Sequence, residues 1–182
     1  MDLIDLLSNP DTREILRERA RALAGRDQNA TAAIGELFLQ FSLGDERYSL
    51  PAAATREVLR FESIAPLPAV PPAVLGLINV RGRLVVCLDI RPLLGLAPTM
   101  PNPSMHLLIV SDGAIEAALL VDQVLAVQPQ TPTLLPTPSS IAGHGVHWVL
   151  GVDEQLSIHL DPTGLLHDPR LAVDSADEPT HP

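Results

Sequence analysis

Two segments far apart in the chain carry the same pattern of leucine, glycine and aspartate. Each copy has a Leu-Gly pair, a strand-like run that ends in Asp, and a Leu-Leu pair: Leu75-Gly76, 84–89 and Leu93-Leu94 in the first, Leu150-Gly151, 156–161 and Leu165-Leu166 in the second. The offsets from the first Leu of each run to the Asp and to the Leu pair are identical. Unless this is a chance match among Leu-rich strands, the chain contains two units of one architecture, about 36–95 and 105–167.

Hydrophobic residues between 36 and 167 follow the pattern of short β-strands. Large apolar residues stand at every second position from Leu37 to Leu43, and 47–50 returns as the next strand after a turn at 44–46. Further strand-like runs are 58–61, 76–80, 84–89, 106–110, 115–121, 147–151 and 156–160. Proline clusters at 66–72, 98–103 and 129–138 separate them as loops, because proline cannot donate to a ladder. Units of about 60 residues bury a marginal core alone, so we expect them to pack on each other and allow for exchanged strands.

The two ends of the chain differ from this middle part. Residues 1–33 hold five of the 12 Arg and predict a helix between Asp11, which can cap it, and Gly25, which can end it, followed by a linker. This helical extension either packs on the β units, frays in solution, because a lone helix of about 14 residues is marginal in water, or serves as a second docking element. Residues 168–182 are rich in acids and proline, which predicts a disordered acidic tail.

Charge and composition exclude several classes of protein. Arg supplies all 12 basic residues against 22 acidic ones, and the net charge of −10 offers no basic track for nucleic acid. Hydrophobic residues make up 46 %, which indicates a globular chain. The single Cys87 excludes an internal disulfide and a Cys-based zinc site. Because no signal peptide or membrane-spanning run is found, we expect a cytoplasmic protein without direct membrane insertion.

Few residues are candidates for catalysis. Asp89 and Asp161 end equivalent strands, so a paired-carboxylate site is one interpretation; the other is that each Asp caps the short helical turn that follows it. His144 and His147 flank Gly145 in an expected loop, and no clustered partner favours a metal site there. We therefore expect neither a catalytic residue nor a metal or cofactor.

A strand–turn–strand segment with a polar centre is the strongest candidate for binding. Gly82 supplies the backbone freedom for a tight turn, and the side chains of Asn79 and Arg81 should leave one face of the strand while those of Ile78 and Val80 leave the other. Three roles for Arg81 stay open: a solvated turn residue, an internal partner of an acid such as Glu57, or an anchor for another protein.

Residues 38–166 resemble the CheW domain, the coupling protein of bacterial chemotaxis. In the first half the matching residues are Phe38-Leu39-x-Phe41-x-Leu43-Gly44, Tyr48, Glu57-Val58, Gly76, Asn79-x-Arg81-Gly82 and Val85-x-x-Leu88-Asp89-x-Arg91. In the second half they are Leu119-Leu120-Val121-Asp122-x-Val124, Leu150-Gly151, 156–161 and Leu165-Leu166. The resemblance implies a mainly β fold of two SH3-like five-stranded β-barrels packed on each other, with short helices; the N-terminal helix is extra.

The resemblance also implies a function. It predicts a non-enzymatic scaffold that binds the regulatory domain of a CheA-type histidine kinase through one barrel. It further predicts binding of the cytoplasmic tip of a methyl-accepting chemoreceptor in a groove, which would recruit the protein to membrane-bound receptor arrays. The implied partner-binding residues are Glu57, Asn79, Arg81 and Gly82, with Val58, Ile78 and Val80 as a groove. The alternative is a small-molecule-binding or hydrolytic β-barrel that uses Asp89 with Asp161 or His144 with His147.

Overall fold

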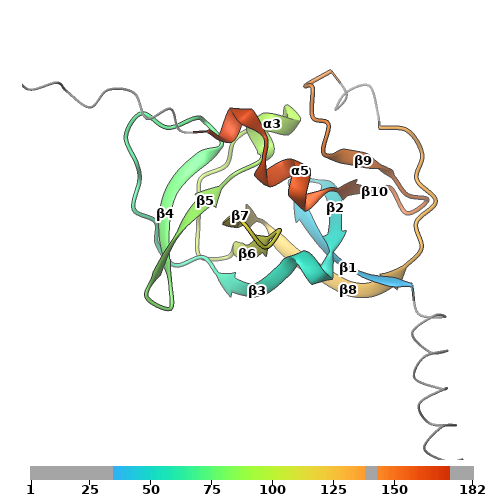
Figure 1. Ribbon diagram of the computed structural model, residues 1–182, viewed down its shortest axis with the longest axis horizontal. Coiled ribbons are helices and arrows are strands. Elements are labelled where there is room, and N and C mark those ends of the chain that lie inside the picture. Colours follow the sequence, from blue (N-terminus) through green and yellow to red (C-terminus); the bar gives the residue numbers. More distant parts are fainter. Residues whose placement is uncertain (1–34, 138–142, 173–182) are drawn as a thin grey trace, which may run out of the picture. The chain divides into compact units, whose positions relative to one another are not determined.

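The computed structural model describes residues 35–137 and 143–172, which form two five-stranded sheets (Figure 1). Sheet 1 has the order β8 (Gln123–Gln130), β1 (Glu36–Leu43), β2 (Glu46–Pro51), β10 (Ser157–Leu160) and β9 (Val149–Val152). Sheet 2 has the order β3 (Thr55–Arg60), β6 (His106–Ser111), β7 (Glu116–Val121), β5 (Arg83–Leu88) and β4 (Val74–Val80). The helices are short: α3 (Arg91–Leu94), α5 (Pro162–Leu166) and 3-10 turns at Ala52–Ala54 and Pro169–Leu171. The predicted mainly β fold is confirmed.

The two sheets have the same construction. In sheet 1, β10 pairs with β2 in parallel and with β9 antiparallel. In sheet 2, β5 pairs with β7 in parallel and with β4 antiparallel. A short helix follows each of the equivalent strands β10 and β5. The sequence repeat is therefore also a structural repeat, in which β4, β5 and α3 correspond to β9, β10 and α5.

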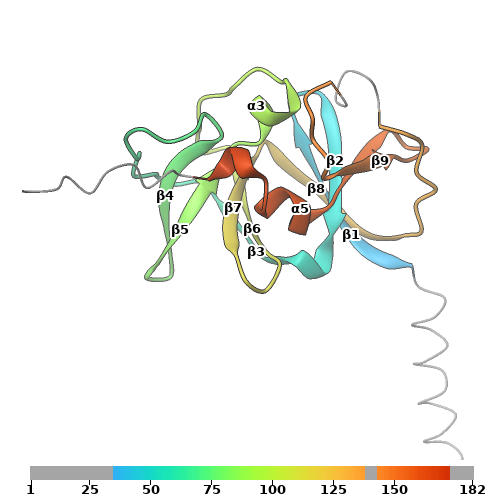
Figure 2. The ribbon, with the colours of Figure 1, turned by 45° about the horizontal axis from the view of Figure 1, so that its top comes forward.

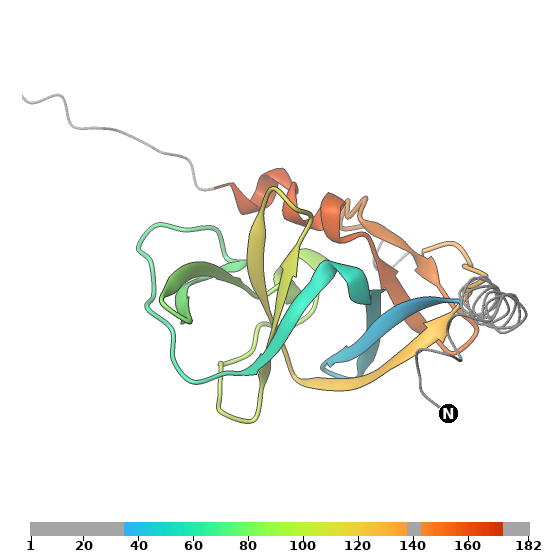
Figure 3. The same cartoon turned by 60° about the horizontal axis from the view of Figure 1, so that its bottom comes forward.

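The two repeats exchange strands. After β1 and β2 in sheet 1, the chain crosses to sheet 2 for β3, β4 and β5; after β6 and β7 in sheet 2, it returns to sheet 1 (Figures 2 and 3). Each sheet thus takes strands from both sides of the boundary expected between 95 and 105. The physical reason lies at the crossovers, where Ala52–Ala54 and Asp122 offer none of the glycine or asparagine that a tight hairpin needs.

Each sheet closes into a barrel through one β-bridge beyond its edge strand. Leu135 bridges to Val152 and closes sheet 1 into barrel 1. Ala65 bridges to Leu77 and closes sheet 2 into barrel 2. Gly76 and Gly151 lie at these closures with φ of 144° and 150°. A Cβ would lie 2.2 Å from the Ala65 carbonyl oxygen at Gly76 and 2.4 Å from that of Leu135 at Gly151. The repeated glycine therefore allows one backbone to approach another closely.

The hydrophobic core has two parts. The larger cluster draws buried residues from both sheets and includes Phe41, Tyr48 and Trp148, none of them measurably exposed. The smaller cluster fills barrel 2: Phe61, Ile78, Val80, Val85, Cys87, Met105, Leu107, Ile109, Ala118 and Leu120. Because both barrels share the larger cluster, neither sheet buries its apolar residues alone.

Two features at the edges of the fold differ from expectation. β8 is missing from the predicted strands, because its sequence QVLAVQPQ contains a proline and its residues are only half-buried or exposed. The tail predicted from 168 begins too early, since Asp168 is buried and 169–171 form a 3-10 turn. The predicted N-terminal helix and linker, and the tail from 173 onward, lie outside the described residues.

Candidate functional site

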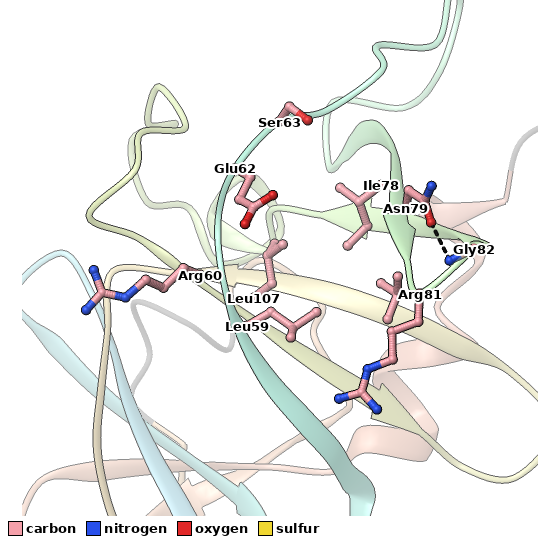
Figure 4. Close-up of a pocket in the computed structure, with 10 residues that line it drawn as sticks. Leu59, Arg60, Glu62, Ser63, Ile78, Asn79, Arg81, Gly82 and Leu107 are labelled. Carbon is pink, nitrogen blue, oxygen red and sulfur yellow. Dashed lines mark hydrogen bonds between the residues drawn. The ribbon is translucent and has the colours of Figure 1, made fainter.

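The candidate site is built around the turn between β4 and β5. Arg81 and Gly82 both have positive φ, 51° and 85°, as the two central residues of a type I′ turn require. The side chain of Asn79 stabilises the turn, because its Oδ1 accepts a hydrogen bond of 2.7 Å from the Gly82 amide (Figure 4). Asn79 and Gly82 thus shape the turn, and Arg81 stands at its tip with 80 % of its side chain exposed.

Arg81 joins the two edge strands of sheet 2. Its Nη2 lies 2.7 Å from Oε2 of Glu57 on β3, and Glu57 is 21 % exposed. Of the three roles open to Arg81, pairing with an internal acid is thus present. An ion pair whose arginine is this exposed contributes about 0–1 kcal/mol to stability.

A groove of about 510 Å³ lies between these two edge strands. Ile78 and Val80 line it, but they are only 4 % and 1 % exposed, because their side chains belong to the core of barrel 2. Val58 is 40 % exposed and does not line this groove. The seven predicted residues therefore divide into an exposed turn with its ion pair, two buried wall residues and one separate exposed valine.

The structure adds residues that sequence reasoning missed. The groove is also lined by Leu59, Arg60, Glu62, Ser63 and Leu107 (Figure 4). Glu116 on β7 pairs with Arg83 at 2.6 Å and with Arg56 at 3.3 Å. Alternation along 56–60 could have indicated that Arg56, Val58 and Arg60 share one exposed face of β3.

The two candidate carboxylates hold local structure. Asp161 accepts hydrogen bonds from the amides of Thr163 and Gly164, which confirms that it caps α5. Asp89 does not cap α3, whose N-cap residue is Ile90. Its Oδ1 instead lies 2.9 Å from Nη1 of the buried Arg91 and accepts a bond from the Arg91 amide. Neither residue lines the grooves found beside the neighbouring helices, so a paired-carboxylate site finds no support.

The histidine and cysteine candidates are similarly unassembled. His144 and His147 are exposed, and the ring of His144 packs against Gly95. Among residues 35–137 and 143–172, no three His, Cys, Asp or Glu side chains converge as metal ligands would. Burial raises the pKa of Cys87 to about 12, with a further contribution from Asp89, so its thiol stays protonated.

Comparison with known proteins identifies the family to which this fold belongs. The family model of the CheW-like domain matches residues 37–170. The chain belongs to the CheW family. It is 27 % identical over 123 residues to a probable chemotaxis protein CheW of Rhizobium etli, covering 65 % of this chain and 79 % of that protein. Protein FrzA of Myxococcus xanthus is 30 % identical over 119 residues, covering 65 % and 71 %.

A solved structure agrees with the fold. The crystal structure of scaffolding protein TtCheW from Thermoanaerobacter tengcongensis matches with a TM-score of 0.59 at 25 % identity, covering 70 % of this chain and 85 % of that one. The predicted SH3-like barrels and CheW resemblance are thereby confirmed, and the chain is a CheW-family scaffold protein of the chemotaxis type. Within the described residues, no helix has the length and apolarity to cross a membrane.

Proposed function

We propose that this protein couples the cytoplasmic tip of a methyl-accepting chemoreceptor to the regulatory domain of a CheA-type histidine kinase. Membership of the CheW family supports the class of partner. The observation that carries the proposal to particular residues is the exposed Arg81 at the tip of a fixed turn, beside a groove between two strand edges. The protein acts by being held between its partners and transforms no substrate.

Arg81 is suited to contact another protein. Its guanidinium can form two parallel hydrogen bonds with a carboxylate, and such bonds are stronger than those between neutral groups. Asn79 and Gly82 fix the turn beneath it, so little conformational entropy of the backbone is lost on binding. Glu57 holds the side chain until a partner's acid replaces it. We assign Glu57, Asn79, Arg81 and Gly82 to this contact.

Exposed apolar side chains on β3 and β8, the strands that follow the two crossovers between the sheets, supply the rest of the interface. Val58 on β3 is 40 % exposed, and Leu125 and Val127 on β8 are 43 % and 55 % exposed. An amphipathic receptor helix buries side chains of this kind. A shift in packing between receptor and kinase then passes the signal without chemistry in the scaffold. Such a protein works in the cytoplasm and is recruited to membrane-bound receptor arrays through its partners.

Direct binding tests the proposal. The full chain is titrated by calorimetry with a chemoreceptor-tip fragment and with the regulatory domain of a CheA-type kinase from the same organism. Arg81→Glu should weaken at least one partner more than tenfold, beyond the effect of an ordinary rim charge. Arg83→Glu is the matched control, since Arg83 lies in the same hairpin, is 61 % exposed and also pairs with a glutamate. Wild-type protein that binds neither partner at tens of micromolar would refute the proposal.

A further inference from the structure

Several equivalent buried positions differ in polarity between the two barrels. Aligning Leu84 with Leu156 makes Val85 equivalent to Ser157 and Cys87 to His159. Cys87 pairs with Ala118 in sheet 2 as His159 pairs with Ser49 in sheet 1. The equivalent positions are therefore Val85 and Ser157, Cys87 and His159, and Ala118 and Ser49. All six side chains are buried, yet the three of barrel 2 are apolar and the three of barrel 1 are polar.

The closing bridges add a fourth equivalent pair. Ile78 follows the bridged Leu77 in barrel 2, and Asp153 follows the bridged Val152 in barrel 1. Ile78 is 4 % exposed within the apolar cluster, whereas Asp153 is a buried carboxylate at 2 % exposure. Four equivalent positions thus exchange an apolar interior for a polar one.

Hydrogen bonds satisfy only part of this polar interior. Asp153 accepts bonds from the amides of Gln155 and Ser157, and its Oδ2 lies 2.9 Å from Nε2 of His159. By contrast, Ser49 Oγ, Ser157 Oγ and His159 Nδ1 are buried without a hydrogen-bond partner among the described residues. A buried polar group without a protein partner lowers stability relative to the apolar group at the same place in the other barrel.

The turn that leads into β10 is strained as well. Leu156 has φ of 61°, a left-handed conformation that a leucine side chain disfavours. Its side chain is 75 % exposed, so no packing compensates for the strain. The equivalent hairpin of barrel 2 places its positive φ at Arg81 and Gly82 within a regular turn instead.

We propose that barrel 1 opens locally at β9 and β10 while barrel 2 stays closed. Local opening follows the weakest packing, and the strain of Leu156 lies in this hairpin together with the unpaired atoms of Ser157 and His159. In the described part of barrel 2 the buried polar atoms without a hydrogen-bond partner belong to β3 and β6, and none belongs to β4 or β5. The polar residues assigned to partner contact lie on barrel 2, whereas the exposed Leu125 and Val127 lie on β8 of barrel 1. Barrel 1 can therefore adjust its shape when the protein is held between two partners, a role that rests on the proposed function. The opening itself does not depend on it.

Hydrogen exchange of the full chain, followed by mass spectrometry, tests the opening. Amides of β9 and β10 should be protected roughly fivefold to thirtyfold less than those of β4 and β5 under native conditions. Ser157→Val, which installs the residue of the other barrel, should raise protection in β9 and β10 by at least about fivefold and leave β4 and β5 unchanged. Val85→Ser is the reciprocal control and should lower protection of β4 and β5.

Two results would overturn the proposal. One is equal protection of the two hairpins in the wild-type chain, which is decisive even if Val85→Ser fails to fold. The other is a Ser157→Val chain with unchanged exchange at β9 and β10. Because no partner is present in this measurement, its failure is distinguishable from a failure to bind receptor or kinase.

Discussion

Replacing Asp168 by Ala should weaken the contacts that hold the C-terminal end of the described chain against the core. Asp168 is 3 % exposed, and its Oδ2 accepts a hydrogen bond of 2.7 Å from Nε1 of Trp148, which is fully buried. The amide and Nε of Arg170 each donate to Oδ1 at 2.9 Å. Without the carboxylate, the indole N–H of Trp148 stays buried with no acceptor.

The magnitude follows from these contacts. An unpaired buried indole N–H costs about 1–3 kcal/mol. The ion pair adds at most about 1 kcal/mol, because the Arg170 side chain is 38 % exposed and water screens it. We therefore expect the free energy of unfolding to fall by about 1–4 kcal/mol. In a chain of this size the melting temperature then drops by roughly 2–15 °C.

Urea unfolding measured by Trp fluorescence checks this directly, since Trp148 is the only Trp of the chain. A second series in a Trp148→Phe background, followed by circular dichroism, separates the indole contact from the Arg170 contact. There Asp168→Ala should cost about 1–3 kcal/mol less, because no donor is left unpaired. An equal loss in both backgrounds would refute the reasoning, as would a loss below about 0.5 kcal/mol in the first.

The same carboxylate predicts a pH dependence. The hydrogen bond from the Arg170 side chain, with those from Trp148 and the Arg170 amide, holds the pKa of Asp168 well below its usual range. A depressed pKa contributes stability that is complete above the unfolded-state value of about 3.9 and is lost as the pH falls through the native one. Asp168→Asn should therefore flatten the acid limb of the stability curve below about pH 4. An unchanged limb would contradict this assignment.

Three further predictions concern other contacts. Arg91→Met should lower the free energy of unfolding in urea by about 3–5 kcal/mol, because it leaves the carboxylate of Asp89 buried without its partner. Arg81→Met should lower it by at most about 1 kcal/mol, because that pair is exposed. Similar losses in the two variants would contradict the burial argument. Gly76→Ala should cost more than about 2 kcal/mol through its clash with the Ala65 carbonyl, while Gly82→Ala, with open space around it, should cost about 1 kcal/mol of backbone strain. Amide hydrogen bonds from Ile115 and Ala114, with a smaller contribution from His167, lower the pKa of Asp112 to about 2. NMR titration of His167→Ala should find it raised but still below its usual value, and a full return to that value would show that the backbone bonds are unimportant.

Strands were predictable wherever one face of a strand meets the core and the other does not. The alternation along β1 is of this kind, and its register with β2 follows from the Gly44 turn. β8 gave no such signal, because none of its residues is fully buried. β10 gave a misleading one: Ser157 and His159 alternate with apolar residues, which indicates a solvent-exposed polar face, yet all residues of the strand are buried. The polar interior of barrel 1 was therefore not visible before the pairing with β2 was known.

In the candidate site, too, features set by neighbouring residues were predictable, and features set by contacts between distant segments were not. The turn at Asn79, Arg81 and Gly82 was predictable, because its geometry depends on residues a few positions apart. Pairing of Arg81 with Glu57 was one of three alternatives, and it could be chosen only after β3 and β4 were known to be the two edges of one sheet. The burial of Ile78 and Val80 likewise depends on what lies across the barrel.

Strand exchange makes each barrel depend on both repeats. Each barrel consists of a hairpin from one repeat and three strands from the other, so neither repeat can fold a barrel by itself. The shared cluster that contains Phe41 and Trp148 would lose one of its walls if either half were removed. A force applied at the Arg81 turn therefore reaches barrel 1 through continuous backbone as well as through packing, because β2 continues into β3 and β7 into β8. Strand exchange therefore links the two barrels without any additional interface.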